Sequence, residues 1–238
     1  MQKHDILQNI TVEKLIFGGS GLATASDGRK IIISGGAIPD AVVDLRITKI
    51  KKNHLEAQIY RIVKRSPLEL DIPSNWQLYG GCKWLPIPYP KQLEIKEQQI
   101  TEAFHTLREE TSDTNWYPII RSPDSEHYRN KVEFSWGKYI SDREGIHDEY
   151  RFGFHVQGQF DRIEDCWYCV LADDMTNQIF RDIDILARES GIPTYDPKTG
   201  VGFWRHLVIR RAKKTGETMV IFSVNGEYNP KSKIKNTT

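Results

Sequence analysis

Residues 41–63 read AVVDLRITKIKKNHLEAQIYRIV, and this stretch decides how the first part of the chain folds. Val43, Leu45 and Ile47 alternate with polar residues, which is the period of a strand with one buried face. A second alternating run follows the polar sequence KKNH. The stretch therefore predicts two strands, over residues 41–51 and 55–63.

Three more short strands are predicted upstream, over residues 10–15, 22–25 and 30–34. Glycine-containing turns separate them, and the pair Asp27-Gly28 is a hairpin signal. Five short strands without a helix predict that residues 1–65 form a small closed β-barrel of the OB type. Such barrels often bind oligonucleotides, but the same fold serves other functions.

The chain beyond residue 65 changes character. Five prolines between residues 66 and 90 predict an irregular connector that contains a Gly-Gly-Cys turn. We expect an α+β domain over residues 91–228 and a loose basic tail over 229–238. In the second helix of this domain we expect Met175, Ile179, Ile183 and Leu186 to face inward. The helices are predicted at 91–110 and 172–190, and the strands at 117–121, 131–139, 151–157, 204–212 and 218–225.

The bulk composition is that of an ordinary globular protein of 238 residues, with 39% hydrophobic and 27% charged residues. No apolar run is long enough to span a bilayer, and the amino terminus lacks the apolar core of a signal peptide. Three cysteines do not make a disulfide framework. We therefore expect a cytoplasmic, monomeric protein with reduced thiols and no membrane partner.

Charge is distributed unevenly along the chain. Residues 1–65 carry 11 Lys/Arg and 6 Asp/Glu, and residues 204–238 carry 8 and 2. The segment between them, 66–203, carries 14 and 24. Two basic ends around an acidic middle suit a polyanionic partner such as a nucleic acid, although patchy solvated surfaces give the same pattern.

Several short motifs occur in a fixed order along the chain. They are Val12–Ala23, Asp27-Gly28, Gly36–Asp40, Gly80–Trp84, Tyr89–Lys96, Ser122-Pro123, Tyr128–Phe134, Gly153–His155, Tyr195-Asp196, Arg205–Arg210 and Thr215–Glu217. Together they resemble the SAM-dependent RNA (uracil-C5) methyltransferases, which form 5-methyluridine in tRNA or 23S rRNA. Asp40 departs from the pattern, because the family has a small residue there.

The resemblance implies an RNA-binding TRAM barrel of the OB type followed by a central α+β domain that positions structured RNA. It also implies a Rossmann-like domain with a glycine-rich S-adenosylmethionine (SAM) loop, a cysteine nucleophile and a carboxylate base. None of these can be placed in the sequence. We therefore expect the SAM-binding domain to be absent from this chain, with no catalytic residue and no cofactor in it, and SAM to serve the parent enzyme.

Basic residues in two regions are candidates for contact with RNA phosphates, the alternative being solvated surface. Arg210 and Arg211 should point to opposite faces of a strand. Four aromatic residues, Trp84, Trp116, Tyr128 and Trp136, suit base stacking, but core packing is the favoured interpretation. The predicted RNA-binding residues are Lys14, Arg46, Lys49, Lys51, Lys52, Arg129, Lys131, Arg205 and Arg210.

The cysteines bear on a cluster that some family members hold. By the resemblance, Cys82 and Cys169 match two of the four ligand positions of a 4Fe-4S cluster. Tyr79 occupies another, and the last falls near Pro73 and Ser74, so we expect no cluster.

Three interpretations of Cys82, Cys166 and Cys169 stay open: buried thiols, which we favour; a metal site with His155 as a fourth ligand; and a redox pair. Two alternative functions follow. One is a stand-alone RNA-binding TRAM-domain protein whose basic tail, with Lys231, Lys233 and Lys235, is its true end. The other is a metal or redox protein that uses the three cysteines.

Overall fold

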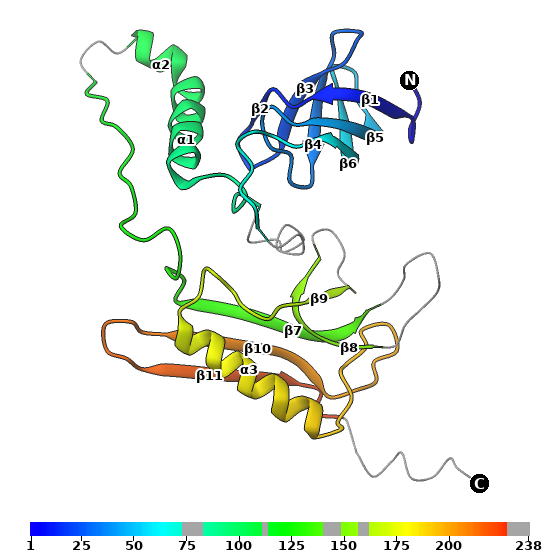
Figure 1. Ribbon diagram of the computed structural model, residues 1–238, viewed down its shortest axis with the longest axis vertical. Coiled ribbons are helices and arrows are strands. Elements are labelled where there is room, and N and C mark those ends of the chain that lie inside the picture. Colours follow the sequence, from blue (N-terminus) through cyan, green and yellow to red (C-terminus); the bar gives the residue numbers. More distant parts are fainter. Residues whose placement is uncertain (73–82, 111–113, 140–148, 157–161, 228–238) are drawn as a thin grey trace. The chain divides into compact units, whose positions relative to one another are not determined.

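The computed structural model describes residues 1–72, 83–110, 114–139, 149–156 and 162–227. The chain forms two compact units, and it passes from the first to the second between Ser122 and Pro123. Each unit has its own sheet (Figure 1). None of the helices in the described ranges is long and apolar enough to cross a membrane.

The first unit contains a six-stranded sheet in the order β1-β5-β6-β4-β3-β2. Neighbouring strands are antiparallel, except that β4 and β6 are parallel. The two strands predicted from residues 41–63 are confirmed as β5 and β6. The strands are β1 (Ile6–Thr11), β2 (Lys14–Leu15), β3 (Gly21–Thr24), β4 (Lys30–Ser34), β5 (Val42–Ile50) and β6 (His54–Lys64).

The expected single strand over residues 10–15 is divided into β1 and β2. Val12 separates them, because its N–H donates to Ala41 O at 2.9 Å and its carbonyl accepts from Asp40 N–H at 2.9 Å. Val12 is itself fully buried, so the turn anchors this part of the chain to the core. That core is aliphatic, and its members include Ala23, Ile31, Ile33, Val43, Leu45, Ile47 and Leu55.

Two helices follow in the same unit, α1 (Tyr89–Ala103) and α2 (His105–Glu110). The single helix expected over residues 91–110 is broken at Phe104. Ile95 packs with Leu15 and Ile38 in a small second core, so α1 lies against the first sheet. The first unit therefore includes α1, whereas we grouped this helix with the second domain from the sequence. Residues 117–121, expected to be a strand, form none.

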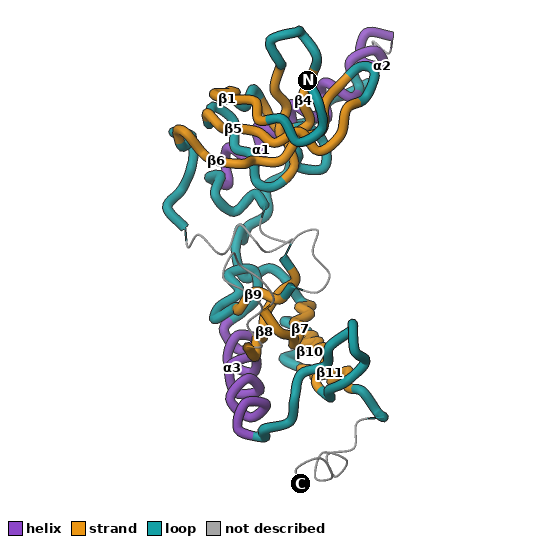
Figure 2. Tube along the Cα trace, turned by 90° about the vertical axis from the view of Figure 1, so that its right-hand side faces the viewer, coloured by secondary structure: helices purple, strands orange, loops and turns teal. Residues whose placement is uncertain are grey.

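The second unit has a five-stranded antiparallel sheet in the order β11-β10-β7-β8-β9. One helix, α3, packs against it (Figure 2). Phe180 of α3 stacks on Phe134 and Phe152, with ring centroids 4.0 and 4.6 Å apart. The elements are β7 (Lys131–Tyr139), β8 (Glu149–His155), β9 (Ile163–Asp165), α3 (Asp174–Glu189), β10 (Trp204–Arg211) and β11 (Thr218–Val224).

Local signals set the ends of α3. The Asp173 carboxylate accepts a hydrogen bond from Thr176 N–H at 2.8 Å, which caps the amino terminus. Gly191 has a φ of +61° just past the last turn, as predicted for a C-terminal glycine. The predicted inward face is only partly right, because Ile179 and Ile183 are half-buried whereas Met175 and Leu186 are exposed.

Candidate nucleic-acid interface

Four of the predicted RNA-binding cations lie on one hairpin of the first unit. Arg46 and Lys49 are exposed on β5, and Lys51 and Lys52 are exposed in the turn to β6. Lys49 Nζ lies 2.9 Å from a carboxylate oxygen of Glu56, which neutralises part of its charge. The hairpin therefore gathers positive charge that solvent and a polyanion can both reach.

Lys14, another predicted cation, lies elsewhere and has a partner. Its Nζ is 2.7 Å from a carboxylate oxygen of Glu102 on α1. The hydrogen bond from Lys14 is the main reason why the pKa of Glu102 is lowered. This pair joins β2 to α1, so Lys14 has a structural role and does not belong to the hairpin group.

Two residues of β6 that we did not predict contact side chains of β5. The Arg46 guanidinium carbon is 4.7 Å from the centroid of the Tyr60 ring. The Arg61 guanidinium donates two hydrogen bonds, of 3.0 and 2.7 Å, to the Asp44 carboxylate. The backbone N–H of Asn9 and then Arg61 lower the pKa of Asp44. The sequence signal for Tyr60 was its outward position in an alternating strand.

In the second unit, Lys131 and Arg210 lie on the same face of the sheet. They are direct partners in the β7–β10 ladder, and side chains opposite each other in a ladder share a face. Arg211 points the other way and bonds the Asp173 carboxylate at 3.0 Å, which confirms that Arg210 and Arg211 point to opposite faces. Lys131 Nζ is 3.5 Å from a carboxylate oxygen of Glu133, so this cation is partly balanced.

The last two predicted cations are placed separately. The Arg205 guanidinium carbon is 4.5 Å from the centroid of the Tyr195 ring, at the start of β10. Arg129 precedes β7, and its backbone N–H donates to Leu171 O at 2.8 Å. These contacts do not bring Arg129 or Arg205 next to Lys131 and Arg210. The predicted cations of the second unit therefore do not form a single cluster.

The four aromatic residues considered for stacking differ in burial, and Trp84 is half-buried against the small second core. Trp136 is buried and stacks on Phe152 with centroids 4.1 Å apart, as a core residue does. Trp116 and Tyr128 are exposed. Phe104 lies 5.9 Å from Trp116 between ring centroids, so that indole is partly engaged.

His206 belongs to the same sheet face as Lys131 and Arg210. Its Nδ1 is 3.0 Å from Ser135 Oγ. Burial is the largest influence on this ring, and its pKa is lowered overall. The imidazole is therefore neutral at neutral pH and adds no positive charge to this face.

Cys166 and Cys169 are buried, reduced cysteines. Burial raises the pKa of Cys169, which is the opposite of what a reactive thiolate requires. This observation does not favour the redox interpretation. The other positions considered for a cluster lie outside the described residues; they are Pro73, Ser74, Tyr79 and Cys82. Within the described ranges, no group of three or more His, Cys, Asp and Glu side chains is arranged to hold a metal ion.

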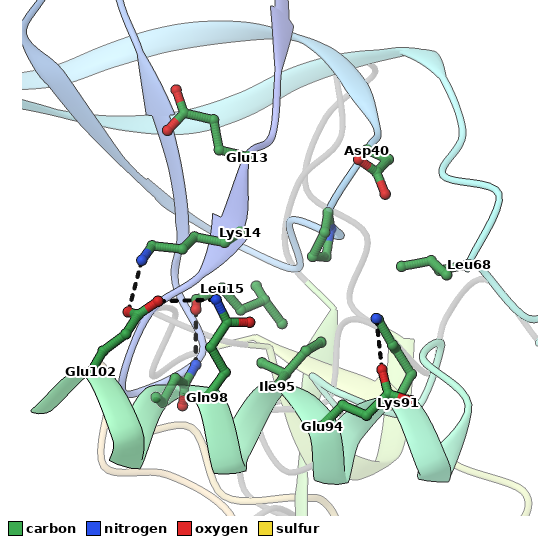
Figure 3. Close-up of a pocket in the computed structure, with 12 residues that line it drawn as sticks. Glu13, Lys14, Leu15, Asp40, Leu68, Lys91, Glu94, Ile95, Gln98 and Glu102 are labelled. Atoms are coloured by element: carbon green, nitrogen blue, oxygen red, sulfur yellow. Dashed lines mark hydrogen bonds and ion pairs between the residues drawn. The ribbon is translucent and has the colours of Figure 1, made fainter. Parts of the chain in front are cut away.

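A pocket of about 220 Å³ lies between α1 and the turns of the first sheet (Figure 3). Lys91 Nζ is 2.7 Å from a Glu94 carboxylate oxygen along its edge. Gln99 of α1 donates a hydrogen bond of 2.9 Å to Leu15 O, which ties the helix to β2 there. Asp40 also lines the pocket. Its φ is +66°, a backbone conformation in which glycine is the least strained residue.

No family model matches the chain. Individual proteins do. An uncharacterized RNA methyltransferase of Caldanaerobacter subterraneus is 31% identical over 221 residues, which cover 92% of this chain and 47% of the relative. One from Chlorobaculum tepidum is 30% identical over 205 residues, which cover 82% of this chain and 42% of the relative. This chain is similar to RNA methyltransferases over most of its own length.

A solved structure extends this relationship to the fold. The tRNA (uracil-54, C5)-methyltransferase of Pyrococcus abyssi, in complex with S-adenosyl-L-homocysteine, matches 92% of this chain with a TM-score of 0.61. The sequence identity is 20%, and the match covers 46% of that enzyme. The chain thus spans about half the length of the curated relatives it matches.

The match corrects one expectation about the fold. We expected the SAM-binding Rossmann-like domain to be absent from this chain, but the chain follows the fold of a methyltransferase solved with S-adenosyl-L-homocysteine over 92% of its length. The expectation rested on a missing glycine-rich loop. A fold is set by the pattern of many residues, so the lack of one short motif is no ground for calling a domain absent.

Proposed function

We propose that this chain docks structured RNA for a methyltransferase that transfers a methyl group from SAM to C5 of uracil in rRNA or tRNA. The observation that carries the proposal is its likeness, at about 30% identity over most of its length, to RNA methyltransferases. The exposed cations of the β5–β6 hairpin add a physical reason, because phosphate neutralisation contributes a large share of the affinity of proteins for nucleic acids.

The RNA surface of the first unit consists of the hairpin cations Arg46, Lys49, Lys51 and Lys52. Lys131 and Arg210 form the corresponding contact of the second unit, because they share a sheet face. Lys14 and Arg211 contribute less, since each is bonded to a carboxylate within its own unit. Arg129 and Arg205 make separate contacts at the ends of their strands.

SAM is proposed for the enzyme as a whole. The pocket at α1 encloses about 220 Å³, below the roughly 300–1,000 Å³ of typical small-molecule sites. Its lining residues therefore do not fit SAM as a site of their own, and no step is assigned to them. When bound, SAM supplies the methyl group, while the cations named above hold and orient the RNA.

The RNA surface is tested by the salt dependence of binding. Replacing Arg46, Lys49, Lys51 and Lys52 together by alanine should weaken the binding of a fluorescein-labelled tRNA transcript. It should also reduce the slope of log affinity against log salt by about one for each phosphate that the variant no longer neutralises. Unchanged affinity and slope would refute the hairpin as the RNA surface.

A matched control removes four cations that already have carboxylate partners in the same unit. This variant should retain the wild-type salt slope, because its charges are neutralised before RNA arrives. The substitutions are Arg29→Ala, Lys30→Ala, Arg65→Ala and Lys91→Ala. An equal loss in both variants would mean that net charge alone, and no defined surface, attracts the RNA.

The position of methylation has its own test. Methylation at C5 of uracil replaces the hydrogen there, so RNA tritiated at that carbon should release tritium when protein and SAM are both present. Methyl incorporation without tritium release would exclude C5 as the target.

A further inference from the structure

The outer face of β1, β5 and β6 combines exposed rings, exposed aliphatic groups and cations. Arg46 is paired with Ile6 on one side and with Gln58 on the other, so these side chains form a row across three strands. Tyr60 is two residues from Gln58 and is 51% exposed. Ile62 follows and is also exposed.

A β-bulge presents Tyr60. In the β5–β6 ladder Leu45 pairs with Ile59 and Asp44 pairs with Arg61, so Tyr60 is the extra residue and has no partner on β5. A bulge turns the side chain it carries away from regular alternation, and bulges are frequent beside functional sites. The side chain of Tyr60 thus projects from the sheet at a position without a partner on β5.

Two arginines flank this ring in different states. Arg46 covers part of the ring, with its guanidinium carbon 4.7 Å from the centroid, and within the described residues no carboxylate lies within ion-pair distance of it. Arg61 is held by Asp44, whose side chain is nearly fully buried and also accepts a hydrogen bond of 3.0 Å from Asn9 N–H. The charge of Arg46 is therefore not balanced by a carboxylate in the described residues, whereas Arg61 is held in position by Asp44.

We propose that Tyr60 and Arg46 form a stacking site for an unpaired nucleobase of single-stranded RNA, with Arg61 beside the neighbouring backbone. The proposal rests on the proposed RNA-binding function and adds a site that reads the base and not only the phosphate. Every nucleobase has a π face, so an exposed aromatic ring with an arginine beside it accepts any of them. An unneutralised cation beside the ring favours an anionic chain over a neutral apolar partner.

Binding of a fluorescein-labelled oligouridylate to the full chain tests this site. Tyr60→Ala should weaken binding by about five- to hundredfold, the range for loss of one stacked base. Tyr60→Leu keeps an apolar side chain in the strand but has no π face, so it should lose the same affinity. Tyr60→Phe keeps the ring and should bind like the wild type. Affinity for a blunt RNA duplex should be the same for all four proteins, since its bases are not free to stack.

The salt slope separates stacking from charge. The Tyr60 variants should keep the wild-type slope, whereas Arg46→Gln should reduce it by about one. Phe17→Ala is the matched control, because Phe17 is 78% exposed in a turn of the same unit. It should leave affinity unchanged.

The outcomes are distinct. Wild-type protein that binds the oligonucleotide, with Tyr60→Ala and Tyr60→Leu no weaker than Phe17→Ala, would overturn the stacking site and leave RNA binding intact. Weakening by Tyr60→Leu that also changes duplex affinity would overturn it as well, because the effect would not depend on a free base. Wild-type protein that binds neither oligouridylate nor tRNA would remove the proposed function itself.

Discussion

Replacing Phe180 by alanine is expected to destabilise the second unit and to leave the first unit unchanged. Phe180 is 2% exposed and stacks on two rings, Phe134 and Phe152. Phenylalanine-to-alanine changes in cores cost about 3–5 kcal/mol, and a whole domain is stable by only about 5–15 kcal/mol. A loss of about 4 kcal/mol raises the fraction of unfolded second unit by roughly a thousandfold.

Hydrogen exchange followed peptide by peptide measures this loss in each unit. Peptides of β7, β8 and β10 should exchange much faster in the variant, because they open only when the unit unfolds. Peptides of β4 and β5 should exchange as in the wild type. Ile185→Ala is the control on the same helix, where the side chain is 55% exposed and the change should stay within about 0.5 kcal/mol.

Two results would refute this reasoning. If Phe180→Ala and Ile185→Ala had equal effects, the aromatic cluster would not be the core of the second unit. If β4 and β5 became unprotected together with β7, the two units would unfold as one cooperative body and not separately.

Two further predictions concern polar contacts of the second unit. Tyr150→Phe should cost about 1–3 kcal/mol in urea unfolding, because Trp136 Nε1–H loses the acceptor it now has at 2.7 Å; no change would mean that water replaces the hydroxyl. Burial alone would raise the pKa of Asp173, but hydrogen bonds from Thr176 and Arg211 lower it overall. The Asp173 carboxylate therefore stabilises the folded unit at pH values above its ordinary pKa of 3.8, and this contribution is lost as the pH falls below that value. Asp173→Asn, which still caps the helix, should flatten that acid limb in thermal unfolding measured against pH; an unchanged limb would show that other carboxylates cause it.

The two strands of residues 41–63 were predictable because the signal is local. The alternation of Val43, Leu45 and Ile47 has the period of a half-buried strand, and all three are buried in the structure. The inward face of α3 was not predictable in the same way. Several apolar stripes fit its sequence, and the choice of Phe180 over Met175 depends on Phe134 and Phe152, which come from distant strands.

The candidate RNA surface also has features that the local sequence predicts and features that depend on contacts between distant segments. Exposed lysines in a hairpin turn follow from the sequence, since a polar turn between two strands faces solvent. The environment of each cation does not, because Lys14 meets Glu102 only after the chain has placed α1 against β2. Tyr60 was missed for a related reason. Its outward position can be read from the alternating strand, but the bulge at this residue depends on the register between two strands.

The packing of α1 against the first sheet decides where the chain can be divided for expression. A fragment that ended at residue 65 would uncover Leu15 and Ile38, which are now buried with Ile95. Such a fragment would expose an apolar patch on its surface and would tend to self-associate. A fragment that ends at Ser122 keeps these residues covered, so the hairpin cations and Tyr60 can be studied in it without the second unit.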